Sequence, residues 1–85
     1  MNKHIEITRH LTVDGTSTYY VVEKSKNSSS IIWHGTNKQA AYQVAYRNAR
    51  KENTPLYDTL YKAEVDRNGV KHIIPVGNEL LEATN

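Results

Sequence analysis

Residues 31–46, with the sequence IIWHGTNKQAAYQVAY, contain the point at which the chain changes from strand to helix. The β-branched and aromatic residues at the start favour a strand, and Gly35 ends it. Thr36 predicts the N-cap of a helix, because its hydroxyl can accept a backbone N–H while Gln39 reaches back to the cap in a capping box. The elements before and after this strand-to-helix junction can be assigned relative to it.

The expected helix has two distinct faces. It should end at about Glu52 or Asn53, because Pro55 cannot continue it. At about 100° per residue, one side is small and apolar. Its members are Ala41, Val44, Ala45 and Ala49, with Tyr42 and Tyr46 at the flanks. The other side carries the polar residues Gln39, Gln43, Arg47, Arg50 and Lys51.

Before the junction, the chain predicts a hairpin. Residues 3–13 alternate with period two, which is typical of a half-buried strand. Asp14-Gly15 predicts a tight turn, because both residues tolerate positive φ. Residues 16–23 are rich in β-branched and aromatic side chains and form the expected return strand.

After the helix, the chain predicts a second hairpin. Residues 57–66 alternate again, and residues 70–76 are the expected return strand. Asn68-Gly69 predicts a two-residue turn between them. That turn would place Val65 opposite His72.

The element order is therefore β-β-β-α-β-β, and the expected fold class is α+β. Because hairpins join the strands, we expect a five-stranded antiparallel sheet with the single helix packed on one face. Residues 1–77 form a single domain in this interpretation. Residues 78–85 form a C-terminal tail, with one helical turn around Glu79.

The composition narrows the classes of function. The chain has 85 residues, a net charge of +2 and no cysteine. A chain of this length has a thin core without room for a deep pocket, and the lack of cysteine excludes disulfides and thiolate metal sites. The sequence shows neither the apolar run of a secretory leader nor the roughly 18 apolar residues of a membrane span. We therefore expect a cytoplasmic protein with no membrane partner.

The polar residues do not form a recognisable catalytic or metal motif. Of the four histidines, His4 and His10 share a strand face, but their spacing in sequence separates them by roughly 20 Å. His34 and His72 have no carboxylate at ligand spacing. We expect no catalytic residues, no metal and no cofactor, and hence a protein that works by binding and is not an enzyme.

Two groups of residues are candidates for binding. The polar helix face sets positive charges beside amides, which suits phosphate or an acidic protein surface, although an ordinary solvated face has the same pattern. The second group is aromatic, because the chain has six tyrosines, one tryptophan and no phenylalanine, and tyrosine is enriched at interfaces. Tyr19 and Tyr20 are adjacent in a strand, so one of them must leave the helix-covered side. The candidate partner-binding residues are Gln43, Arg47, Arg50, Lys51, Tyr19 and Tyr20.

A third candidate surface is the sheet face opposite the helix. Its expected residues are His4, Glu6, Thr8, His10, Leu60, Lys62, Glu64 and Ile73. They carry both signs of charge, which suits a protein better than a polyphosphate.

Residues 20–47, YVVEKSKNSSSIIWHGTNKQAAYQVAYR, resemble the arm-binding domains at the N-termini of phage integrases. Those domains have a three-stranded sheet followed by a threonine-capped helix that opens with an alanine, as in residues 35–40 here. They bind DNA with the sheet, so this resemblance implies a nucleic-acid partner.

Residues 36–76 resemble small phage-encoded ββαββ proteins, among them type I anti-CRISPR inhibitors. The shared features are an alanine-rich helix ending in Lys51-Glu52, a strand, an Asn-Gly turn at residues 66–69 and a final strand. This resemblance implies a phage or mobile-element accessory protein that inhibits a host defence complex, a protein or a ribonucleoprotein, by protein–protein contact in the host cytoplasm. Two alternatives remain open: a small nucleic-acid-binding module using the basic helix face, and a protein that dimerises through a strand edge. Monomer and homodimer are both compatible with the sequence.

Overall fold

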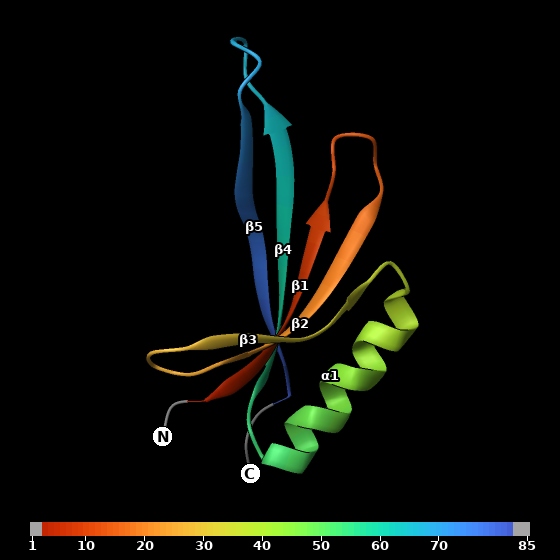
Figure 1. Ribbon diagram of the computed structural model, residues 1–85, viewed down its shortest axis with the longest axis vertical. Coiled ribbons are helices and arrows are strands. Elements are labelled where there is room, and N and C mark those ends of the chain that lie inside the picture. Colours follow the sequence, from red (N-terminus) through yellow and green to blue (C-terminus); the bar gives the residue numbers. More distant parts are fainter. Residues whose placement is uncertain (1–2, 83–85) are drawn as a thin grey trace.

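A computed structural model describes residues 3–82 and confirms the α+β fold class, with one helix packed on a five-stranded sheet that is not closed (Figure 1). The helix and strands follow the predicted order along the chain. They are β1 (His4–Leu11), β2 (Ser17–Lys24), β3 (Ser29–Gly35), α1 (Lys38–Glu52), β4 (Leu56–Val65) and β5 (Lys71–Glu82).

The sheet is mixed, whereas an antiparallel sheet was expected. Its strand order is β3-β2-β1-β4-β5, and the central pair, β1 and β4, is parallel, with Ile5 opposite Leu56. The reason is the crossover: α1 carries the chain from the end of β3 back along the sheet, so that β4 starts at the same end of the sheet as β1. The other neighbouring pairs are antiparallel, as hairpins require.

Both predicted Gly-containing turns are present, but each has a three-residue loop. In the second hairpin, the N–H groups of Gly69 and Asp66 bond the carbonyls of Asp66 and Val70. Gly69 has φ of +79°, and this left-handed residue completes a type I turn with a bulge. The extra loop residue shifts the register by one, so that Val65 lies opposite Lys71 instead of the expected His72.

The helix begins one residue later than expected. Asn37, and not Thr36, is the N-cap, and its side-chain Oδ1 accepts the N–H of Ala40 at 3.0 Å. The helix ends at Glu52 as predicted, and Asn53 caps it with a left-handed φ of 51°. Asparagine tolerates this conformation better than most other side chains do.

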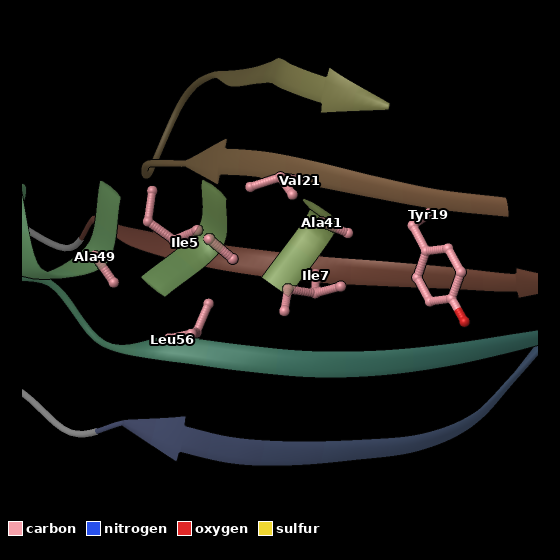
Figure 2. Close-up of a cluster of buried hydrophobic side chains, with 8 residues drawn as sticks. Ile5, Ile7, Tyr19, Val21, Ala41, Ala49 and Leu56 are labelled. Atoms are coloured by element: carbon pink, nitrogen blue, oxygen red, sulfur yellow. The ribbon is translucent and has the colours of Figure 1, made fainter. Parts of the chain in front are cut away.

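The core lies between α1 and the middle of the sheet (Figure 2). The alanines of α1 face the sheet, and their small side chains let the helix sit close to β1 and β2. The fully buried large side chains all come from strands. They are Ile5, Ile7, Val21 and Leu56. Tyr19 is buried beside them at 8 % exposure, so it belongs to the core.

One side of the sheet extends beyond the helix. The β4–β5 hairpin rises away from α1 in Figure 1, and every residue from Glu64 to Leu80 is exposed. Several of these exposed side chains are large and apolar, among them Val65, Ile73 and Leu80. Residues 78–82, expected to belong to a tail with a helical turn, instead continue β5 as far as Glu82. The last part of that expected tail, residues 83–85, lies outside the described residues.

Candidate binding surfaces

A shallow, open hollow of about 1070 Å³ lies along one flank of α1. We call this surface the helix groove, and it is formed by Lys38, Gln39, Tyr42, Gln43, Tyr46, Arg47 and Arg50. These residues recur at helical spacing, so that one turn after another contributes an aromatic, an amide or a cation. The groove therefore combines aromatic, amide and basic side chains.

Tyr42 is anchored within the helix groove. Its hydroxyl donates a 2.6 Å hydrogen bond to Asp58 Oδ2 on β4, and Arg9 Nε donates to Asp58 Oδ1 at 3.0 Å. Burial raises the pKa of the Tyr42 hydroxyl well above its usual range, and the Asp58 carboxylate raises it further. Asp58 is only 8 % exposed, whereas its partners Arg9 and Tyr42 are partly exposed. The hydrogen bond from Tyr42 to Asp58 restrains the position of the aromatic ring.

The basic side chains of the helix groove differ in the contacts they already make within the protein. Lys38 lies over the ring of Tyr42 at 5.9 Å, and Arg50 lies over the ring of Tyr46 at 5.3 Å. Arg50 also pairs with Glu82 at 3.4 Å. Arg47 forms no ion pair with any residue from 3 to 82. Arg47 is therefore the groove cation that is most available to an external acid.

The structure separates the predicted site residues into different places. Gln43, Arg47 and Arg50 meet in the helix groove, whereas Lys51 is exposed on α1 but does not line it. Tyr19 is in the core, and Tyr20 lies on the open face of the sheet. Sequence reasoning missed the roles of Lys38, Tyr42 and Tyr46. Their signal was present as the i, i+4 spacing from Lys38 to Arg50, which was interpreted only as the edge of the buried face.

Rings from neighbouring strands form a row across the open sheet face. Tyr20 stacks on His34 with centroids 6.1 Å apart, and His10 stacks on Tyr61 at 5.2 Å. His10 also meets Tyr20 edge to face at 5.2 Å, so the row is continuous from β3 to β4. Partial burial lowers the pKa of His10, which keeps its ring neutral near pH 7.

A hollow of about 400 Å³ lies over this row. We call it the aromatic groove, with His10, Tyr20, Lys24, Ile31, Tyr61 and Ile73 among its lining. Ile31 is on β3 and Ile73 is on β5, so the apolar sides come from strands at the two edges of the sheet. A second hollow of about 190 Å³ shares His10, Tyr20, Tyr61 and Ile73, and so extends the groove toward Lys71.

The expected composition of the open face was partly wrong. His4, Glu6, Thr8, His10 and Ile73 lie on it, but Leu60, Lys62 and Glu64 belong to the helix side of the sheet. The reason is that Leu56 packs into the core, which turns the odd-numbered residues of β4, such as Tyr61, to the open face.

Glu6 is a buried carboxylate on the open face, with 5 % exposure. Lys24 Nζ lies 3.1 Å from Glu6 Oε2, and His4 Nε2 lies 3.4 Å from the same oxygen. Burial alone would raise the pKa of Glu6, but the hydrogen bond and charge of Lys24, helped by Thr59 and His4, lower it. The carboxylate is therefore ionised and neutralised by its own neighbours.

The remaining strongly interacting titratable groups build turns. Asp66 accepts the N–H groups of Asn68 and Val70 and lies 2.8 Å from His72 Nε2; this histidine and these backbone bonds lower its pKa. Asp14, in the first hairpin, accepts hydrogen bonds from Thr12 and Thr16, which lower its pKa to about 2. Within residues 3–82 there is no group of three or more potential metal ligands, and no helix long and apolar enough to cross a membrane.

Comparisons of this chain with protein-family models, with curated proteins and with solved structures gave no match.

Proposed function

We propose that this chain is a non-catalytic binding protein that docks through the helix groove on an acidic protein surface. The observation that carries the proposal is Arg47, an exposed cation without an acidic partner among the described residues, which lines the same groove as the anchored ring of Tyr42. Tyrosine and arginine side chains are enriched in protein-binding hot spots. The helix groove is also too open to enclose a small molecule.

The resemblance of residues 36–76 to phage-encoded inhibitors supplies the biological setting of this proposal. In it, the chain is an accessory protein of a phage or mobile element, and its partner is a protein or ribonucleoprotein complex of host defence in the host cytoplasm. Inhibition follows from covering the partner's surface, so it requires a fixed stoichiometry and no turnover.

The test begins with a pull-down from host lysate, with and without nuclease, to identify the partner. Binding of the purified partner is then measured for Arg47→Glu and for Lys51→Glu. Both variants reverse an exposed basic residue of α1, but only Arg47 lines the helix groove. We expect Arg47→Glu to slow association at least tenfold, because like charges then meet at the interface, and Lys51→Glu to change it little.

Several outcomes would contradict the proposal. Equal effects of the two substitutions would show that only net charge matters. Capture lost on nuclease treatment, together with duplex DNA binding that weakens generally in both variants, would favour the nucleic-acid alternative on this face. An effect produced by a substoichiometric amount of the protein, with continued turnover, would make it an enzyme.

A further inference from the structure

We propose that the aromatic groove is a second binding site, for single-stranded nucleic acid. The site lies on the open face of the sheet and shares no residue with the helix groove. It is therefore independent of the proposed protein contact, and either proposal can fail without the other.

The first argument is the row of rings. His34, Tyr20, His10 and Tyr61 lie next to one another across four neighbouring strands. Single strands are held by aromatic side chains on which their unpaired bases stack, and every base offers a planar face for this contact. The neutral His10 ring stacks on Tyr61 and meets the edge of Tyr20, so it holds these two rings in place without the cost of burying a charge.

The second argument is charge. Lys24, which pairs with the buried Glu6, lines the main hollow, and the exposed Lys71 lines the smaller hollow that continues it. No carboxylate of the described residues lines either hollow. The nearby Glu6 is buried and already neutralised by Lys24 and His4. Lys71 is therefore the cation of the trough that is available to a phosphate of a bound strand.

The third argument concerns the shape of the ligand. The two hollows share His10, Tyr20 and Tyr61, so they form one trough that crosses the rings, with Ile31 and Ile73 at its sides. A flexible single strand can lay bases on the floor of such a trough. The bases of a duplex are stacked on one another and do not reach the rings, which excludes paired DNA as the ligand of this site.

The test uses a fluorescein-labelled ten-nucleotide thymidine strand, with anisotropy as the readout. The same strand paired with its complement tests for a duplex, and unlabelled thymidine monophosphate as a competitor tests for a mononucleotide site. We expect saturable binding of the single strand, at least tenfold weaker binding of the duplex, and no competition by the mononucleotide at equal nucleotide concentration.

Matched variants locate the site. Tyr61→Leu removes a ring of the groove, and Tyr57→Leu removes a ring from the same strand and face outside the groove lining. Tyr61→Leu should weaken binding about fivefold or more, as the loss of one base stack does, and Tyr57→Leu should not. Lys71→Ala, at an exposed position that poses little risk to folding, should flatten the dependence of log affinity on log salt by about 0.7, whereas Lys51→Ala leaves it unchanged.

The proposal is overturned by any of three results. The first is no saturable binding of the single strand by the wild-type protein. The second is tighter binding of the duplex. The third is equal affinities and equal salt slopes for Lys71→Ala and Lys51→Ala, both of which are checked for folding by circular dichroism. Loss of partner binding in Arg47→Glu with single-strand binding intact would separate this site from the helix groove.

Discussion

Glu6 shows how one side chain can carry opposite physical effects. Burial opposes its charge, but Lys24 and His4 lie within hydrogen-bonding reach of the same carboxylate oxygen and outweigh the burial. Such a group is costly when its partners are removed, because a buried charge is then left uncompensated. Glu6 is therefore one buried side chain through which acid should destabilise the fold.

We expect the ionisation of Glu6 to make the free energy of unfolding smaller as the pH is lowered. Because the pKa of Glu6 is lower in the folded state than its ordinary value of 4.5, the unfolded chain binds the proton first. The contribution is complete above that ordinary value and is lost as the pH drops through the folded pKa. Glu6→Gln should cost about 1–3 kcal/mol near neutral pH and give a flatter stability profile in acid.

Urea unfolding between about pH 6 and pH 3 measures this effect, since the fitted unfolding free energy follows the proton linkage. Glu64→Gln is the control, because Glu64 is an exposed carboxylate on the other side of the sheet. Parallel profiles for wild type and Glu6→Gln would show that Glu6 does not contribute to the pH dependence.

At the level of elements, the sequence prediction was wrong about the residue that caps the start of the helix. Thr36 and Asn37 are both good N-cap residues, and the capping box favoured Thr36. In the structure, Asn37 caps, and its side chain binds the N–H of Ala40. Local preference does not separate two adjacent caps, because the choice depends on how the helix packs on the sheet.

Asn37→Ala should therefore lower the unfolding free energy by about 1 kcal/mol, because an N–H at the start of α1 loses its acceptor. Thr36→Ala is the natural control and should change it by less than about half that amount. Chemical denaturation of both variants, followed by far-UV circular dichroism, makes the comparison. A larger loss of unfolding free energy for Thr36→Ala than for Asn37→Ala would show that Thr36 is the N-cap.

Most elements follow from the sequence, whereas their relations to one another do not. Alternation predicted both hairpins and the buried face of the first strand, and the alanines predicted the buried side of α1. The parallel pairing of β1 with β4 depends on a contact between distant segments, which no local pattern records. The row of rings was missed for the same reason, because His10 and Tyr61 become neighbours only through that pairing.

On the scale of the whole molecule, the sheet is supported unevenly. Helix α1 contacts β1, β2, β3 and β4, but the far end of the β4–β5 hairpin projects beyond it (Figure 1). Among the residues of that hairpin end, Val65 and Val70 have exposed side chains instead of core contacts. Stability in such an arm comes mostly from its own backbone hydrogen bonds.

Amide hydrogen exchange should show this difference directly. We expect the amides of β1 and β2 to exchange only through global unfolding, whereas those near the 66–70 turn open locally at a much lower free energy. Heteronuclear NMR at several pH values resolves individual amides. Equal protection in the turn and in β1 would mean that the arm is stabilised by contacts that the isolated chain does not display.

The parallel pairing of β1 with β4 should also affect the rate at which the chain folds. Each hairpin closes a short loop, but pairing Ile5 with Leu56 joins positions about fifty residues apart, which carries a larger loss of chain entropy. Contacts of this kind slow folding, because the entropy is lost before the contact energy is gained. The three-stranded N-terminal part and the C-terminal hairpin are therefore expected to form early as separate pieces. Their joining at the centre of the sheet then sets the folding rate of the whole chain.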